Sequence, residues 1–594
     1  PLVYAYQADD LDQRNNLFGN IFAKIDFPFI KGLSYKINFS NNVETTRKYT
    51  FQHYGVNFQG LGSKYYSNAY TMSSDNILSY KHVFNNVHSL DVTLLYGFEK
   101  RNYDNTSASS SVFVNQALGY NKLQAGSSSN QQVSSGAWKE ASLYNMARLF
   151  YSFRDKYMLT GTIRRDGFSG FSENNKFGLF PSVALGWVLT KESFFPESVN
   201  FVNNLKLRLS YGSTGNRTIG RYQTLARVEG GYRYVTESGS SVYGQSITSM
   251  SCSNLKWETT TGLNLGIDFG LFSSRINGTI DYYNNNTKNI LYNVDIPSIS
   301  RFDNFPTNLG KLHNHGLEIS ITSENIRTKH LLWNTTFVFS RNRDKLVSLL
   351  GFDNDGDGKE DDLISEGLFI GEPLCVNYHY EITGKMYQLG DVIPAGADVG
   401  TFIIVDQNTD GIIDQDDYVK LNYSDPSYRF SITSVLEYKN WSLNLLINSI
   451  QGGKNYYYAA DNLIAHWGTG GDSFNYVNDE QHYRYTFPKG LDYWLPENPN
   501  AKYQRIDAKL SQQYVASRWT QRNFIRLQDV SLSYSFKPEL LSKIRINALR
   551  LFLSGKNLLT ITKWPGWDPE TGERINMTGR PVLKSYVIGL DVEF

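Results

Sequence analysis

The sequence has few cysteines, no long apolar run and no excess of charge of either sign. Its two cysteines, Cys252 and Cys375, lie far apart and lack the CxxC spacing of zinc modules, which excludes a disulfide scaffold and a cysteine-rich metal module. No stretch of about 18 apolar residues is present, so no membrane-spanning helix is predicted. The formal net charge is +1. Nucleic-acid binding needs a basic face, so nucleic acid is excluded as the expected partner.

What the sequence does contain is aromatic residues, at 14%, and a repeated two-residue period. In 259–271 the odd positions, such as Leu263, Leu265 and Ile267, are apolar, whereas the even positions are small or polar. The same alternation recurs in 331–340, 441–448 and 529–536. A period of two predicts β-strands with one apolar and one polar face.

The lengths of these runs distinguish a membrane barrel from a soluble sandwich. Strands are expected at 15–27, 31–42, 77–85, 87–99, 143–153, 155–165, 176–190, 203–213, 254–271, 275–285, 311–323, 329–342, 426–438, 440–452, 522–537, 545–556 and 581–594. Many are longer than the usual soluble strand of about 5–6 residues and match the roughly 9–11 residues that a tilted strand needs to cross a bilayer. Aromatic residues near the run ends resemble an interfacial girdle.

The segments between these strands alternate between short and long. The long ones are expected as loops at 43–76, 100–142, 214–253, 343–425 and 453–521. Outer-membrane barrels have short periplasmic turns and long outer loops. The sequence is therefore interpreted, over 1–594, as one all-β, transmembrane antiparallel β-barrel with its long loops outside the cell.

The last expected strand also favours a barrel. Its apolar positions, interpreted as a barrel-insertion signal, are Tyr586, Ile588, Leu590, Val592 and Phe594. As a soluble edge strand the same segment would be an aggregation hazard. Seventeen strands alone would leave two unpaired edges in lipid, so an odd number of further strands is expected from outside this sequence.

One acidic segment in 343–425 fits an EF-hand-type loop. Its expected calcium ligands are Asp406, Asn408, Asp410, the Ile412 carbonyl, Asp414 and Asp417. Oxygen ligands at positions 1, 3, 5, 7, 9 and 12, with Gly411 at position 6, match that pattern. Position 12 is Asp417 instead of glutamate, whose longer side chain reaches a cation more easily. The alternative is a solvated acidic turn.

A second acidic segment begins in the same way. It contains Asp353, Asp355, Asp357 and Asp361, but Ile364 at its position 12 cannot ligate. A weaker metal site and a plain acidic turn both remain open for it.

No other motif predicts chemistry. His313 and His315 share a strand face but lack a third ligand, and neither GxSxG nor HExxH occurs, so neither an enzyme nor an organic cofactor is expected. Loop 453–521 is rich in rings, with Tyr456, Tyr457, Tyr458, Trp467, Tyr493 and Trp494 as candidate contacts. These rings suit a glycan, a peptide or a partner lid. The alternative is packing within the loop itself.

Several segments in order resemble one known family. They are 164–187 (RRDGFSGFSENNKFGLFPSVALGW), 205–216 (LKLRLSYGSTGN), 257–291, 371–387, 399–421 and 494–569, the last containing LRLFLSGKNLLTITKWPGWDP. Together they resemble the C-terminal barrel portion of SusC/RagA-like TonB-dependent transporters of Bacteroidota outer membranes. The resemblance covers most of the chain from about residue 15.

The resemblance carries its own expectations. It implies a 22-stranded barrel, of which about 17 strands lie here, while the plug and the TonB box are not in this sequence. It implies energised import of oligosaccharides or oligopeptides across the outer membrane of a Gram-negative bacterium. The implied partners are a SusD-like surface lipoprotein, the TonB complex and membrane lipid. The alternatives are a passive structural or adhesive barrel and a soluble β-rich carbohydrate enzyme. The loop alternation argues against the enzyme.

Overall fold

The computed structural model describes residues 9–53, 60–196, 199–296, 298–302, 304–456, 492–505, 508, 510–511, 514, 516–541, 546–564, 568–570 and 582–593. Within these ranges, no helix is both long and apolar enough to span a membrane. The helices of the described residues are short. They are α3 (Pro538–Leu541) and 3₁₀ turns at Gly119–Ala125, Ser128–Asn130, Glu173–Asn175, Leu189–Lys191, Ser298–Ser300, Ile364–Glu366 and Gln415–Asp417.

Seventeen strands of the described chain belong to one antiparallel sheet. They are β1 (Asp9–Asp26), β2 (Leu33–Gln52), β3 (Leu61–Phe84), β4 (His88–Ser111), β5 (Gln132–Phe153), β6 (Tyr157–Phe168), β7 (Phe177–Val188), β8 (Val202–Asn216), β11 (Glu258–Leu271), β12 (Ile276–Asp295), β13 (Asn304–Arg327), β14 (Leu331–Ser348), β19 (Pro426–Tyr438), β20 (Trp441–Gly452), β23 (Phe524–Ser535), β24 (Ala548–Thr562) and β25 (Ser585–Glu593). Each corresponds to one of the strands expected from the sequence, so the all-β prediction is confirmed.

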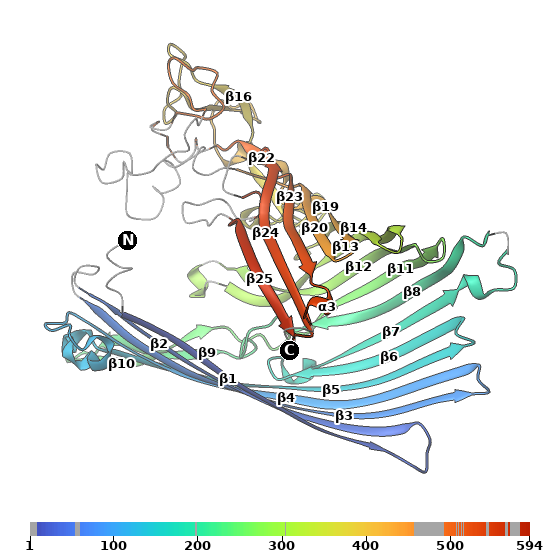
Figure 1. Cartoon of the computed structure of the whole chain (residues 1–594). Helices are drawn as coiled ribbons and strands as arrows, with labels where there is room; N and C mark the ends of the chain where they lie inside the picture. The colour runs from blue at the N-terminus through green and yellow to red at the C-terminus, as the bar shows by residue number, and fades with distance from the viewer. Residues whose placement is uncertain are drawn as a thin grey trace. The chain divides into compact units, whose positions relative to one another are not determined.

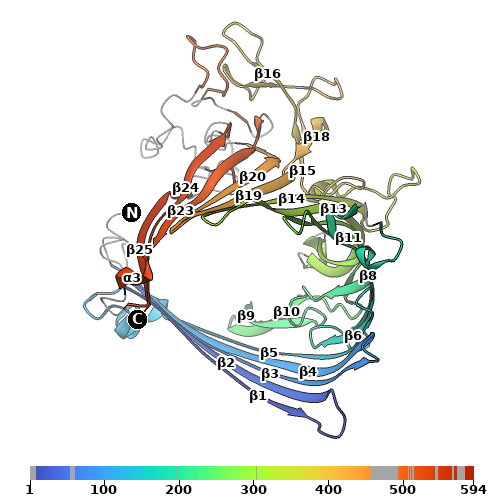
Figure 2. The same ribbon diagram turned by 45° about the vertical axis from the view of Figure 1, so that its right-hand side comes forward.

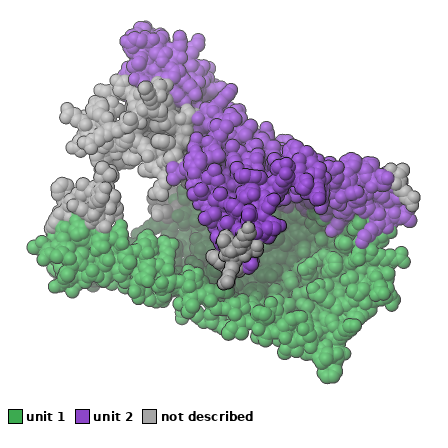
Figure 3. Space-filling model, viewed as in Figure 1, with its two compact units in different colours: residues 1–188, 208–263, 286–309 green, residues 189–207, 264–285, 310–594 purple. Residues whose placement is uncertain are grey.

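The chain divides into two compact units (Figure 3), of which the first contains residues 1–188, 208–263 and 286–309. In this unit β1 to β7 pair with one another in chain order (Figure 1). Asn85 and Asn86, in the short turn between β3 and β4, both have positive φ. Asparagine tolerates this left-handed conformation, which tight hairpin turns require.

The second unit contains residues 189–207, 264–285 and 310–594. Here β13, β14, β19, β20, β23, β24 and β25 also pair in chain order. Strands β19, β20, β23, β24 and β25 lie side by side in Figure 2. Neighbours in sequence are therefore neighbours in the ladder, as in an up-and-down sheet.

Several expected loops contain more strand than the sequence predicted. Segment 43–76 is strand up to Gln52 and again from Leu61, and segment 100–142 is strand up to Ser111 and again from Gln132. Polar and aromatic pairs continue these ladders. Tyr103 illustrates them, because its hydroxyl lies 2.5 Å from that of Tyr65 and its ring stacks on Trp138. The expected strands are too short here, because apolar alternation ends before the ladder does and pairs of polar or aromatic residues continue it.

The other expected loops contain small two-stranded sheets. Segment 214–253 holds β9 (Arg227–Val235) and β10 (Ser241–Ser249). Segment 343–425 holds β15 (Val376–Tyr380) paired with β18 (Tyr418–Tyr423), and β16 (Ile382–Met386) paired with β17 (Phe402–Ile404). Segment 453–521 begins with β21 (Lys454–Tyr456) and ends with β22 (Trp519–Gln521), which pair.

The long strands have one exposed apolar face. On β24, Leu551 and Leu553 are exposed, and on β25 Ile588 and Leu590 are 76% and 63% exposed. The Leu265 side chain on β11 is 47% exposed. Large apolar side chains in regular exposed rows are unusual for a soluble protein and typical of a surface covered by lipid or a partner.

Candidate functional site

A cavity of about 540 Å³ opens on the polar face of the first unit. Its wall comes from β4, β5, β6, β7 and β8, together with Arg217, which follows β8, and one tryptophan that precedes β11. The lining residues are Glu99, Ser142, Tyr144, Thr162, Arg164, Asp166, Gly167, Phe180, Ser182, Ser213, Thr214, Gly215, Arg217 and Trp257. The cavity therefore combines aromatic rings, hydroxyl groups and charges of both signs, a mixture typical of ligand pockets.

Tyr144 is positioned from two sides. Its ring lies over Gly97 on β4, where an added Cβ would be 2.2 Å from the ring, so a larger residue at Gly97 would displace it. Its hydroxyl donates a 2.6 Å hydrogen bond to Oδ1 of Asp75 on β3. Three adjacent strands thus hold this ring in one place.

Arg164 and Asp166 are two residues apart on β6, so they point to the same face. The guanidinium binds the carboxylate through three short contacts, with Nε 2.8 Å from Oδ2 and 3.0 Å from Oδ1, and Nη2 2.8 Å from Oδ1. The guanidinium carbon also lies 4.9 Å from the centre of the Tyr144 ring. Arg164 is therefore fixed while still presenting donors to the cavity.

Arg217 supplies the second cation of the cavity. It donates to Ser142 Oγ, its Nη2 lies 4.0 Å from a Glu99 oxygen, and its guanidinium lies over the Phe168 ring. Arginines and carboxylates placed together bind amides, hydroxyls and charged termini by hydrogen bonds. The adjacent rings favour stacking with a sugar or a side chain.

A packed, mainly aromatic cluster adjoins the cavity and shares Phe180 and Trp257 with its lining. Its buried members are Phe168, Phe171, Phe180, Ile219, Cys252, Leu255 and Trp257. The Trp257 indole also donates a 3.2 Å hydrogen bond to the carbonyl of Lys176. Packing against this cluster holds the lining residues in place, which lowers the entropy cost of binding a ligand.

The sequence analysis did not predict this site. Arg164 and Asp166 stand in a segment quoted for its family resemblance, but no motif marked them. The sequence indicates that Arg164 and Asp166 share one face of their strand. Their proximity to Tyr144 depends on the register between β5 and β6, which pairs Tyr144 with Asp166.

The ring-rich loop 453–521 is described only in part. Tyr456 ends β21, while Tyr457, Tyr458 and Trp467 lie outside the described residues. Trp494 is only 2% exposed and packs with Met386, Phe402 and Ala501. Its ring packs this part of the loop against β16 and β17, and a ligand or lid contact by Trp494 stays a prediction. Contact by Tyr493 stays a prediction.

The predicted calcium loop uses its oxygens to accept backbone hydrogen bonds. Asp406 accepts from the amides of Thr409 and Gly411, at 2.7 and 2.9 Å. Asp417, fully buried, accepts from the amides of Gln407 and Asp414 at 2.7 and 3.0 Å, which draws the two ends of the loop together. Asn408, Asp410 and Asp414 each accept an amide two residues onward.

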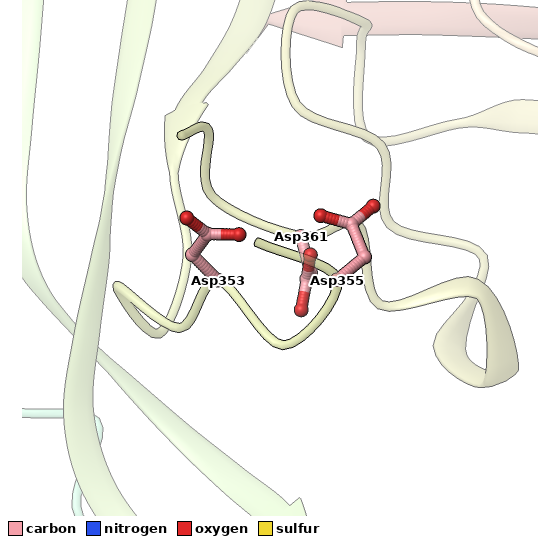
Figure 4. A group of neighbouring side chains, drawn as sticks. All are labelled: Asp353, Asp355 and Asp361. Carbon is pink, nitrogen blue, oxygen red and sulfur yellow. The ribbon is translucent and has the colours of Figure 1, made fainter. Parts of the chain in front are cut away.

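The second acidic segment gathers its carboxylates more closely. Ligand atoms of Asp353, Asp355 and Asp361 lie within 4.8 Å of one another (Figure 4), and this is the one such group in the described part of the chain. Asp357 instead approaches Lys359, at 3.4 Å. The structure thus brings together three of the four weaker candidates, while calcium binding at either segment stays a prediction.

Calcium binding at Asp406–Asp417 predicts a measurable effect. A cation would remove the repulsion among the four carboxylates of this loop, so calcium should protect its amides from hydrogen exchange and leave the sheet unchanged. The double variant Asp406→Ala with Asp410→Ala should abolish this protection, whereas Asp353→Ala with Asp355→Ala serves as the matched control at the other segment. Calorimetry showing no calcium uptake by the wild-type protein up to millimolar concentration would contradict the prediction.

Two further predicted features are placed by the structure. His313 and His315 stack at 5.3 Å between ring centres, and His313 contacts the amide oxygen of Asn284. In the insertion signal, Tyr586, Ile588, Leu590 and Val592 are exposed on β25, and Phe594 lies outside the described residues. Recognition of that signal stays a prediction.

Comparison with known proteins identifies the family. Residues 2–558 match the family model described as TonB dependent receptor-like, beta-barrel. TonB-dependent receptor P3 of Formosa agariphila is 30% identical over all of this chain, and SusC of Bacteroides thetaiotaomicron is 27% identical. The solved RagAB peptide transporter superimposes with a TM-score of 0.80 at 24% identity over all of this chain and 63% of its own.

The chain belongs to the TonB-dependent receptor β-barrel family. Over its whole length it is similar to SusC in sequence and to the RagAB transporter in fold. It spans 59% of P3 and 57% of SusC, so it corresponds to only the barrel part of these relatives. This family consists of outer-membrane transporters of Gram-negative bacteria and not of enzymes. In such a barrel the apolar face meets lipid and the polar face lines the lumen.

Proposed function

We propose that this chain forms the wall of a TonB-dependent importer that takes up oligosaccharides or oligopeptides together with a SusD-like surface lipoprotein. The observation that carries this proposal is the cavity around Arg164, Asp166 and Arg217. It lies on the polar face of a barrel whose relatives include SusC and the RagAB peptide transporter.

The lining of the cavity supports an extended polar ligand. Its cations and carboxylates balance, so a ligand needs no net charge to bind. Tyr144 and Trp257 offer rings, and the hydroxyls of Ser142, Thr162 and Ser182 offer donors and acceptors. Sugars and peptide backbones both match such a lining, and neither requires bond-making chemistry from the protein.

The loops support the proposed orientation. Strand β14 ends at Ser348 and β20 ends at Gly452, both at the edge of the sheet opposite the short turns, such as the turn between β19 and β20 at Lys439. The long segments of the sequence follow these strand ends. We infer that the long segments face outward, where a capping lipoprotein docks. The plug and the TonB-interacting part come from outside this sequence.

Uptake assays test the function with a matched pair of arginines. Arg164 faces the lumen, and its neighbour Arg165 lies on the other face of β6, over the Phe177 ring. In cells producing the full-length transporter and its lipoprotein, Arg164→Gln should lower uptake of labelled oligosaccharide or oligopeptide at least several-fold, while Arg165→Gln should not. Dissipating the proton-motive force should stop wild-type uptake. Uptake that persists without it would favour a passive barrel.

A further inference from the structure

The outward face of β13 and β14 changes character along the strands. Near the short turn it is apolar: Ile321 pairs with Phe337 and Ile319 with Phe339. Further along, Leu317 pairs with Arg341, His315 with Arg343, and His313 with Lys345. Directly opposite residues share a face, so the register gathers a cationic patch of Arg341, Arg343 and Lys345, with His313 and His315 on the same face.

The height of the cationic patch matches a membrane interface. Leu331 begins β14 at the short turn, and Arg341 follows ten residues later. At about 3.3 Å per residue and a tilt of about 40°, this places Arg341 about 25 Å above the turn, which is the usual height of the apolar band. The Phe339 ring, two residues below Arg341 on the same face, lies 5.8 Å from the Tyr428 ring on β19 between ring centres, as in an interfacial girdle.

The charges of the patch are left without acidic partners. The acidic residues of 311–348 are Glu318, Glu324 and Asp344, and all three occupy even positions on the opposite face. Within the described ranges, neither Arg341, Arg343 nor Lys345 has a carboxylate within 4 Å, although Arg343 donates to the carbonyls of Asn342 and Pro426. Three cations in a row, above a lipid-facing surface, therefore carry an uncompensated positive charge.

We propose that this patch binds the phosphate groups of an anionic glycolipid in the outer leaflet of the outer membrane. Arginine forks suit phosphate oxygens geometrically, and each basic side chain near a membrane surface adds to its attraction for anionic lipid. The apolar rows below the patch would contact the acyl chains of the same lipid. This inference rests on the orientation proposed above, with the long segments outside.

The test uses the full-length transporter in uncharged detergent, titrated with phosphorylated lipid A and observed by native mass spectrometry. Arg341→Gln, Arg343→Gln and Lys345→Gln combined should weaken lipid A binding at least tenfold. The matched triple Arg327→Gln, Lys329→Gln and His330→Gln, at the short-turn end of the same strands, should change it less than twofold. If the first triple variant does not fold, lysine acetylation of the wild-type protein is measured instead. Bound lipid A should slow the acetylation of Lys345 several-fold and leave the acetylation rate of Lys329 unchanged.

Three outcomes would overturn the proposal. Equal affinity for phosphatidylglycerol would remove the outer-leaflet assignment, and displacement of lipid A by millimolar inorganic phosphate would indicate a simple anion site. If the first triple changes the oligomeric mass and not lipid binding, the face is an interface between copies. Uptake measured on the same variants separates the two proposals. Lost lipid binding with normal uptake in the first triple variant agrees with both the import function and a separate lipid site. Normal lipid binding by wild-type protein that shows no energised uptake would contradict the import function alone.

Discussion

Replacing Arg526 by alanine is expected to destabilise the second unit by about 3–5 kcal/mol, because it removes one partner of a buried ion pair with Asp568. Arg526 on β23 is 2% exposed, and its guanidinium lies 2.6 Å from Asp568 and 2.5 Å from Glu570. Its Nε also donates to Thr560 Oγ1 on the adjacent β24, at 3.0 Å. One side chain therefore joins two strands to the segment 568–570.

An exposed arginine provides the control. Arg550 on β24 lies 2.6 Å from Asp591, but both side chains are more than half exposed. Such surface pairs contribute at most about 1 kcal/mol, so Arg550→Ala should shift the urea midpoint little. The measurement is urea unfolding of the full-length protein refolded into liposomes. The apolar double variant Arg526→Met with Asp568→Leu should recover part of the loss. Similar midpoints for Arg526→Ala and Arg550→Ala would contradict the prediction.

The strands were predictable because a lipid-facing wall imposes a strict pattern. Each membrane-crossing run must keep one apolar face, and the rows on β11, β14 and β20 show it in the sequence itself. Outside the bilayer both faces of a hairpin meet water, so the pattern disappears although the ladder continues. The extended ends of β2 to β5 were missed for this reason, since pairs such as Tyr65 with Tyr103 hold them.

The cavity was not predictable because it is made of neighbours that are distant in the sequence. Glu99, Tyr144 and Asp166 come from three strands and Arg217 follows a fourth, β8, so only the fold brings them to one place. The burial of Trp494 was hidden for the same reason, because a ring in a loop gives no local sign of its packing partners. Composition indicates which residue types can bind a ligand, whereas the fold determines which of them meet.

The orientation of the wall leads to the second large effect. Leu265 on β11 is expected to face lipid, because its side chain is 47% exposed in a row with Leu263 and Ile267. Leu271 ends the strand at the short turn, six residues further on. At about 3.3 Å per residue and about 40° of tilt, Leu265 lies about 15 Å above that turn, close to the middle of a band about 25 Å tall.

Leu265→Arg should therefore reduce folding into liposomes severely, at a cost of about 2–4 kcal/mol for arginine at the bilayer midplane. Asn264→Arg adds the same side chain one residue away on the lumenal face, where water solvates it, and should leave most of the protein folded. The fraction folded is measured by heat-modifiable gel mobility of the full-length protein after dilution from urea into phosphatidylcholine vesicles. Equal losses for the two variants would mean that the faces of β11 are assigned wrongly. A larger loss for Asn264→Arg would reverse the assignment, and with it the lumenal placement of the polar rows.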